Sequence, residues 1–144
     1  MPIWKTPITL DQLKDRSKNT LTEHIGIEFV EIGDDYLTAW MPVDDRTRRI
    51  GGILHGGASV ALAETVGSVA AAFCVDQKRK RIVGIEINAN HIRQVSSGWV
   101  TGTARPFHVG RMTHVWEIKI HDGEERLVCI SRLTVAVVDI PAGE

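Results

Sequence analysis

One carboxylate stands within an apolar stretch of the chain. Residues 53–75, ILHGGASVALAETVGSVAAAFCV, contain Glu64 near the middle and no lysine or arginine. On a helix its neighbours three and four residues away would be Val60, Ala61, Gly67 and Ser68. Three placements of Glu64 are compatible with this pattern: exposed at an edge, paired with an arginine of a sheet, or protonated in the core. An unpaired acid in an apolar site has a raised pKa and can serve as a base or a nucleophile.

Two glycines follow His55 where this helix would begin. The first N–H groups of a helix are free and carry the positive end of its dipole, so Gly56 and Gly57 would let a ligand approach them closely. Such donors can stabilise a carbonyl oxygen as it becomes an oxyanion. The alternative is that the glycines only turn the chain tightly into the helix.

The spacing of the two candidate groups limits how they can act. Gly56 and Glu64 are eight residues apart, which is about 12 Å along a helix axis. A carbonyl group held by the Gly56 N–H cannot also be reached by Glu64 of the same chain. If both act on one carbonyl, the protein is a twofold dimer with the helices side by side and two equivalent sites.

The rest of the chain predicts the elements that would position these groups. Short helices are expected at 10–17, capped by Thr9, and at 20–26. Residues 27–43 predict a hairpin that turns at 33–35. Strand patterns follow at 82–95, 98–110, 112–122 and 126–140, with a turn signal at Asp122–Gly123. A helix that is apolar on all sides must be wrapped by this sheet, which predicts an α+β architecture.

Composition excludes several classes of protein. The 144 residues suit one domain spanning 1–144, and 17 basic against 18 acidic residues give a formal net charge of −1. No basic field is available for nucleic acid or an anionic membrane. A membrane span is unfavourable because a central Glu64 costs roughly 2.5–3.5 kcal/mol on insertion. The N-terminus lacks the pattern of a secretory leader, so we expect a cytoplasmic protein.

Other kinds of catalytic centre find no support in the motifs. The six histidines show no metal-binding spacing, and no GxSxG, Walker or GxGxxG pattern is present, so no metal or cofactor is expected. Cys74 and Cys129 lie far apart in apolar runs, which predicts buried thiols rather than nucleophiles.

The segments LHGGASVALAETVGS, DDRTRR and VGIEINANHIR together resemble the 4-hydroxybenzoyl-CoA thioesterase-like hotdog family. The resemblance is closest to bacterial thioesterases of the 1,4-dihydroxy-2-naphthoyl-CoA and enterobactin-proofreading types, and it covers nearly the whole chain from IWK at 3–5. It implies a hotdog fold, in which a curved antiparallel sheet wraps a long central helix. It also implies homodimers with sites at the interface, assembled into homotetramers, that hydrolyse acyl-CoA, in particular aryl-CoA, to free acid and CoA.

The resemblance implies roles for the residues at the centre of the motif. Glu64 matches the catalytic carboxylate, acting as nucleophile or as base for water, and Gly56 matches the donor that polarises the thioester carbonyl. His55 matches a histidine that supports substrate placement, and Ser68 a hydroxyl that positions the water or the acid. His91 matches a histidine near the acyl group.

Contacts with the rest of the substrate are expected on two further segments. Residues 105–114 and 79–84 offer basic groups for the phosphates of CoA, although solvated surface charge is the commoner use of such residues. The extended edge at Val83 and Gly84 could pair its backbone with the pantetheine amides. The predicted substrate-binding residues are Arg49, Gly57, Val83, Gly84, His91, His108 and Arg111.

Arg49 departs from the family pattern, because close relatives carry a glutamine at that position. Its guanidinium could pair with Glu64 across the interface and lower the pKa of the acid, or it could face solvent. Two other functions remain open: a non-catalytic acyl-CoA sensor, and an acyl-thioester dehydratase on the same fold. The substrate could be a thioester of CoA or of an acyl-carrier protein, with CoA entering only as part of the substrate.

Overall fold

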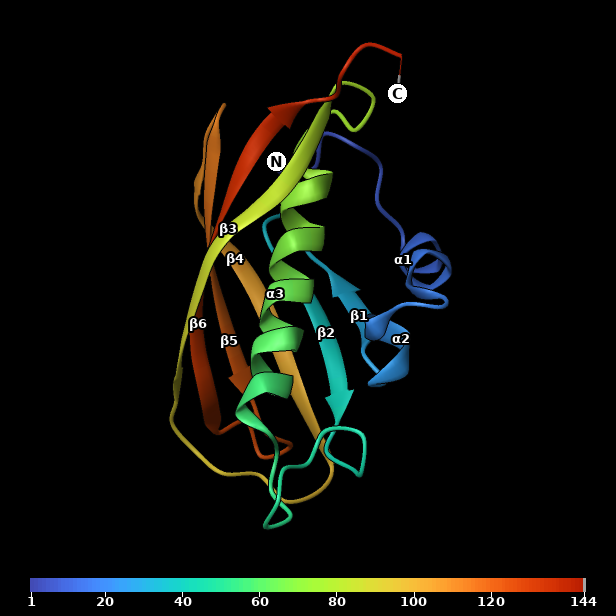
Figure 1. Ribbon diagram of the computed structural model, residues 1–144. Coiled ribbons are helices and arrows are strands. Elements are labelled where there is room, and N and C mark those ends of the chain that lie inside the picture. Colours follow the sequence, from blue (N-terminus) through green and yellow to red (C-terminus); the bar gives the residue numbers. More distant parts are fainter. Residues whose placement is uncertain (144) are drawn as a thin grey trace.

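A six-stranded antiparallel sheet wraps around one long helix in the computed structural model, which describes residues 1–143 (Figure 1). The helices are α1 (Leu10–Ser17), α2 (Leu21–His24) and α3 (Gly56–Phe73). The strands are β1 (Glu28–Ile32), β2 (Leu37–Pro42), β3 (Lys80–His91), β4 (Trp99–Val109), β5 (Thr113–His121) and β6 (Leu127–Asp139). The strand order is β1-β2-β4-β5-β6-β3, so β3 is an edge strand. The predicted α+β architecture is confirmed.

Small residues let the sheet approach α3 closely. Gly67 is buried, and a Cβ on it would lie 2.7 Å from Leu133 and 3.2 Å from Ile118. On the strands, alternate side chains turn inward: in β5, Trp116 and Ile118 are fully buried against the helix. By length and composition α3 could also cross a membrane, with a mean hydropathy of 1.3. The packing of α3 inside the sheet explains why the helix is apolar.

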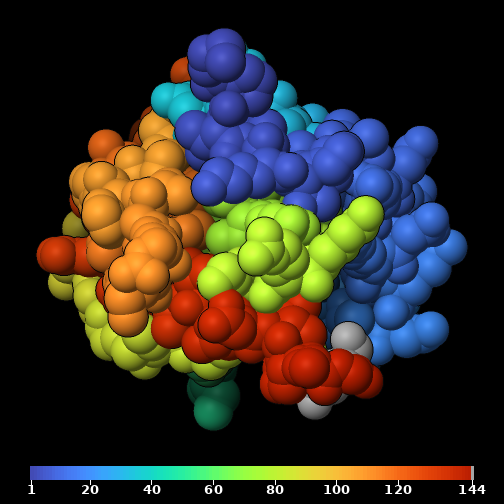
Figure 2. Space-filling view, turned by 90° about the horizontal axis from the view of Figure 1, so that it is seen from above, coloured from blue at the N-terminus to red at the C-terminus, as the bar shows by residue number. Residues whose placement is uncertain are grey.

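The N-terminal segment closes the C-terminal end of α3. The predicted cap at Thr9 forms a capping box with Gln12, which fixes the start of α1. Before it, the Lys5 and Thr6 N–H groups both donate to the Phe73 carbonyl at 2.9 and 3.2 Å. Figure 2 shows this end from above, with the loop after α3 between the N-terminal segment, the β4–β5 hairpin and the end of the chain.

The predicted hairpins form, and in one turn the left-handed residue is not the glycine. Between β5 and β6 the chain makes a loop over 122–126, and its left-handed residue is Glu125 (φ 62°) rather than Gly123. The Asp122 carboxylate organises this loop by accepting the N–H groups of Glu124 and Arg126, both at 2.9 Å. The Arg126 N–H and the other donors hold the pKa of Asp122 below its usual value. The turn signal at Asp122–Gly123 therefore predicted the hairpin correctly, although it did not specify which residue takes the left-handed conformation.

Replacing Gly67 by valine tests the close packing of α3. The added methyl groups enter space occupied by Leu133 and Ile118, and overpacking of this kind costs about 1–3 kcal/mol of unfolding free energy. Gly123→Val is the matched control, because a Cβ at Gly123 meets nothing within 4 Å. Urea denaturation of both variants measures the difference. Equal stability of the two variants would contradict the packing described here.

Candidate active site

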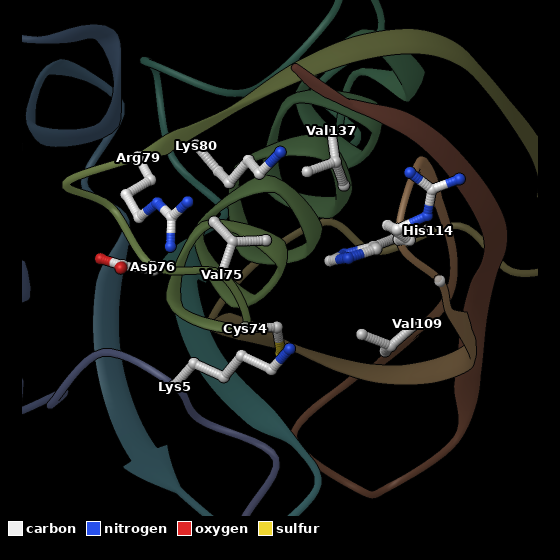
Figure 3. Close-up of a pocket in the computed structure, with 11 residues that line it drawn as sticks. Lys5, Cys74, Val75, Asp76, Arg79, Lys80, Val109, His114 and Val137 are labelled. Atoms are coloured by element: carbon white, nitrogen blue, oxygen red, sulfur yellow. The ribbon is translucent and has the colours of Figure 1, made fainter. Parts of the chain in front are cut away.

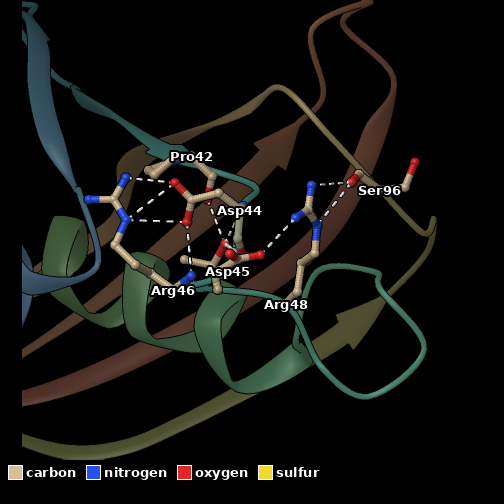
Figure 4. A network of polar contacts seen from close by, with 7 residues as sticks. Pro42, Asp44, Asp45, Arg46, Arg48 and Ser96 are labelled. Atoms are coloured by element: carbon tan, nitrogen blue, oxygen red, sulfur yellow. Dashed lines mark hydrogen bonds and ion pairs between the residues drawn. The ribbon is translucent and has the colours of Figure 1, made fainter.

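The loop before α3 is held by a network of charged side chains (Figure 4). Arg46 makes a two-pronged contact with Asp44, with N–O distances of 2.7–3.2 Å, and this contact holds the pKa of Asp44 below its usual value. Arg48 reaches across to the Ser96 carbonyl at 3.0 and 3.2 Å and also pairs with Asp45. The DDRTRR segment thus anchors the start of the long helix to the β3–β4 connection.

The backbone N–H groups of the two glycines at the start of α3 differ in their hydrogen bonding. His55 is the N-cap, and its Nδ1 accepts a hydrogen bond from the Gly57 N–H at 2.7 Å. The His55 N–H itself donates to the Thr47 carbonyl at 2.8 Å. Within residues 1–143 the Gly56 N–H has no acceptor. Of the two predicted donors, only Gly56 is therefore free to bind a substrate oxygen, because Gly57 is engaged in the cap.

A cavity of about 400 Å³ opens at this end of the helix. His91, at the end of β3, covers Gly56, since a Cβ on that glycine would lie 3.0 Å from His91 Nε2. Arg49 also lines the cavity, but its Nη1 donates to the Ile50 carbonyl at 2.6 Å. The structure thus brings Arg49, Gly56 and His91 together, and among residues 1–143 no Asp or Glu lines this cavity.

Glu64 lies further along α3 and is exposed in the single chain. Over the described part of the chain its carboxylate accepts no hydrogen bond and pairs with no cation. Glu64 packs against β3, where a Cβ on Gly84 would lie 3.0 Å from its Oε2. Of the three placements left open by the sequence, the single chain adopts the exposed one. Burial of Glu64 in an apolar site would require a second subunit.

Ser68 and Gly84 line a second cavity, of about 500 Å³, beside Glu64. Ser68 follows Glu64 by one turn and is half-buried. Gly84 and its neighbour Val83 belong to the exposed edge strand β3, and the Val83 side chain is exposed as well. Five predicted site residues thus lie along one surface of the molecule, formed by α3 and the adjacent edge of β3: Gly56, Glu64, Ser68, Val83 and Gly84.

Two predicted substrate contacts are remote from the start of α3. His108 is the penultimate residue of β4 and Arg111 lies in the β4–β5 turn, at the opposite end of the long helix. Arg111 borders a third cavity together with His114, which belongs to the 105–114 segment expected near the CoA phosphates, and Lys5, to which the sequence gave no role. Sequence reasoning also missed Arg93 and Gln94, which line the cavity at the helix start. The NANHIR motif, which supplied His91, was the signal for Arg93.

Two other features bear on the chemistry. Both cysteines are buried, as predicted, and burial raises the pKa of the Cys74 thiol to about 12, so this thiol stays protonated near neutral pH. Across residues 1–143 no three His, Cys, Asp or Glu side chains cluster in a way that could hold a metal ion. Among the predicted catalytic groups, the Glu64 carboxylate and the Gly56 N–H have no partner within residues 1–143.

Comparison with known proteins identifies the family. The model of the Thioesterase superfamily matches residues 51–129, which include the start of α3, Glu64 and β3. The chain belongs to this superfamily. Its sheet and central helix are the hotdog fold of thioesterases of known structure, and its activity is that of a thioester hydrolase. The family, the fold and the enzyme class predicted from the sequence are thereby confirmed.

Individual relatives are similar over nearly their whole length. The chain is 48% identical to the 1,4-dihydroxy-2-naphthoyl-CoA hydrolase of Escherichia coli, over 94% of this chain and 99% of the relative. It is 50% identical to the proofreading thioesterase EntH of Cronobacter turicensis, over 94% and 98% of the two chains. A thioesterase structure from Haemophilus influenzae superposes with a TM-score of 0.95 at 45% identity and covers 99% of both chains.

The cap at His55 gives a prediction about stability. His55→Ala removes the acceptor of the Gly57 N–H, and the loss of an N-cap costs about 1 kcal/mol of unfolding free energy. His55→Asn keeps a side-chain acceptor that is favoured at N-caps and should stay within a few tenths of a kcal/mol of the parent. Chemical denaturation compares the three proteins. If alanine and asparagine are equally stable at this position, the cap is not what His55 contributes.

Proposed function

We propose that the protein hydrolyses acyl-CoA thioesters, with aryl-CoA as the preferred class, at sites shared between two subunits. The observation that carries the proposal is a pair of unsatisfied groups on one rigid helix: the free N–H of Gly56 and the unpaired carboxylate of Glu64. The preference for aryl groups is supported by the E. coli relative, whose name specifies a naphthoyl-CoA substrate. Apolar side chains on the wall of the helix-start cavity, among them Ile53 and Val128, suit such a group.

A second subunit is required by the length of the helix. The two groups are about 12 Å apart along α3, too far to meet one carbonyl group. Two α3 helices lying antiparallel would bring Gly56 of each subunit opposite Glu64 of the other, which makes two equivalent sites. The edge strand β3 supports this arrangement, because it is 12 residues long and exposes Val83 and Ile85 beside α3. Pairing of β3 with a second copy would cover this unpaired edge and bury Glu64.

The chemistry follows from these positions. The Gly56 N–H binds the thioester oxygen and stabilises the negative charge that develops on it, a contribution of about 2.7–4 kcal/mol per donor. As general base, Glu64 of the partner subunit takes a proton from water while the water oxygen attacks the carbonyl carbon. The C–S bond then breaks, and the thiolate of CoA leaves. Direct attack by Glu64 would instead form an anhydride, which water hydrolyses in a second step.

The remaining residues serve substrate binding in this scheme. His91 packs over Gly56 and would contact the acyl group, and Ser68 would hold the attacking water near Glu64. The backbone of Val83 and Gly84 would hydrogen-bond the pantetheine arm before it reaches the helix tip. The absence of a side chain on Gly84 gives the Glu64 carboxylate its place, since a Cβ there would come within 3.0 Å of Oε2.

A panel of CoA thioesters tests the proposal against its two rivals. Release of free thiol from aryl-CoA and acyl-CoA esters, followed with a thiol reagent, supports hydrolysis. Hydration of an enoyl-CoA without thiol release would identify a dehydratase. Binding of the esters without turnover would identify a sensor. The dehydratase is disfavoured by the helix itself, on which the only acid, Glu64, has no neighbouring histidine.

Substitution of the acid gives the sharpest prediction about rate. Glu64→Gln keeps the size of the side chain but removes its basicity, so turnover should fall a hundredfold or more, as is typical for loss of a general base. Because Glu64 makes no hydrogen bond or ion pair with any of residues 1–143 of its own chain, the variant should fold normally. Glu117→Gln is the control, since it removes the same charge from a strand remote from this surface. Near-normal turnover by the Glu64 variant would remove that residue from the mechanism.

Mixed dimers test whether each site is shared. Gly56→Val blocks the helix N–H, and Glu64→Gln disables the acid, so neither homodimer should be active. A dimer with one subunit of each kind contains one intact site and one doubly defective site. Random exchange of equal amounts should restore about a quarter of wild-type activity. Failure to recover activity after verified subunit exchange would count against a site built from two chains.

A further inference from the structure

The cavity at the C-terminal end of α3 brings several cationic side chains together with apolar ones. It measures about 400 Å³ and lies between the N-terminal segment, the loop after α3 and the β4–β5 hairpin (Figure 3). Four of its residues carry positive charge: Lys5, Arg79, Lys80 and Arg111. Among residues 1–143, Asp76 is the one acid in the lining. The proposed hydrolysis takes place towards the other end of the helix and leaves this arrangement unexplained.

His114 contributes an unsatisfied donor to this cavity. Its side chain is almost completely buried, at 1% exposure, and Figure 3 shows the ring projecting into the space between the cations. Its Nδ1 accepts a long hydrogen bond from Trp116 Nε1 at 3.5 Å, which places the ring proton of the neutral form on Nε2. In the described chain, Nε2 has no hydrogen-bond partner. A buried donor of this kind requires an acceptor.

Three of the four cations that line this cavity are not held in an ion pair within residues 1–143. Lys80 pairs with Asp139, but Lys5, Arg79 and Arg111 form no ion pair within residues 1–143. Burial lowers the pKa of His114, and its electrostatic interactions with His108 and Lys5 lower it further, which favours the neutral imidazole. Positive charges and a buried N–H donor that converge on one cavity favour an anion with several acceptor oxygens.

The negative end of the helix dipole does not oppose such a ligand strongly. The Phe73 carbonyl is already occupied by the N–H groups of Lys5 and Thr6, and the Val75 carbonyl accepts the Thr6 hydroxyl at 2.7 Å. Cys74 lines the cavity, but its thiol is protonated and brings no negative charge. The end of α3 therefore presents few free acceptors to the cavity.

We propose that this cavity is a binding site for a phosphate-type anion, with His114 Nε2–H, Lys5, Arg79 and Arg111 as its donors. The anion could come from either of two sources, a free phosphate ion or a phosphate group of a bound CoA ester. The second source rests on the proposed function; the first does not. Cys74 follows Glu64 by ten residues, which is about 15 Å along the helix. A CoA ester that reached from the active site to this cavity would therefore have to extend along β3.

Binding of inorganic phosphate to the intact protein tests the site directly. Thermal unfolding is measured with increasing phosphate against chloride at equal ionic strength, together with the ¹⁵N signals of the His114 ring. A saturable rise in Tm accompanied by a shift of the His114 Nε2 resonance is expected. The double variant Lys5→Gln/Arg111→Gln should bind phosphate at least tenfold more weakly. The control Lys14→Gln/Arg132→Gln removes the same charge from exposed positions outside the cavity and should match the parent within twofold.

Two results would overturn the proposal. One is a response to phosphate that does not saturate and leaves the His114 resonance unmoved in the wild-type protein, as expected for a cavity that holds water alone. The other is equal phosphate binding by the cavity variant and the control variant. The wild-type titration decides the matter even if the double variant fails to fold.

A second measurement assigns the source of the anion. If the site takes a phosphate of CoA, CoA will displace phosphate from His114, and the cavity variant will raise KM for an acyl-CoA but not for the phosphate-free acyl-pantetheine. If the site takes free phosphate, CoA will leave the His114 signal unchanged, and the ratio of the two KM values will stay that of the parent. Both outcomes require the anion site. Neither the phosphate titration nor its conclusion depends on whether the protein hydrolyses thioesters.

Discussion

The rigidity of α3 sets the distance between the two groups that a thioester would have to meet. An α-helix rises about 1.5 Å per residue, so its free N–H at Gly56 and its carboxylate at Glu64 cannot converge within one chain. Each group is also incomplete by itself. In the part of the chain that the structure describes, the N–H lacks an acceptor and the exposed carboxylate has no partner. The proposal of a shared site follows from this single constraint, because a second copy placed antiparallel supplies the missing partner at each position.

The rest of the fold serves to hold that helix in place and leave one side of it open. Gly67 and the other small residues of α3 let five strands of the sheet approach it. The Asp44–Arg46 pair and the contacts of Arg48 fix the loop that leads into its N-terminus. Along the uncovered side, α3 lies next to the unpaired edge of β3, where exposed apolar side chains favour association with another copy.

Much of the fold and part of the candidate site could be predicted from the sequence, because the patterns that indicate them involve residues close together in the chain. The apolar segment around Glu64, the cap at Thr9 and the strand periodicities all depend on neighbours in the chain, and they gave the fold correctly. The free N–H at Gly56 and the burial of both cysteines were likewise within reach of such reasoning. The motif segments led to the family, which the comparisons confirmed.

What the sequence missed depends on where side chains turn in three dimensions. Gly57 was expected to bind substrate, but the His55 ring folds back and takes its N–H. Asp122 shapes its hairpin through its carboxylate, which moves the left-handed conformation to Glu125. The basic segments 79–84 and 105–114 were recognised in the sequence, but no spacing rule joins Arg79 and His114 to the distant Lys5 in one cavity.

The most direct test of the central claim is a crystal structure of the assembled protein with a CoA analogue whose sulfur is replaced by a methylene group. The account predicts the analogue's carbonyl oxygen about 3 Å from the Gly56 nitrogen of one subunit. The carboxylate of Glu64 of the partner subunit should lie within direct or single-water reach of the carbonyl carbon. A monomer in the crystal and in solution, or a ligand that meets both groups from one chain, would contradict it.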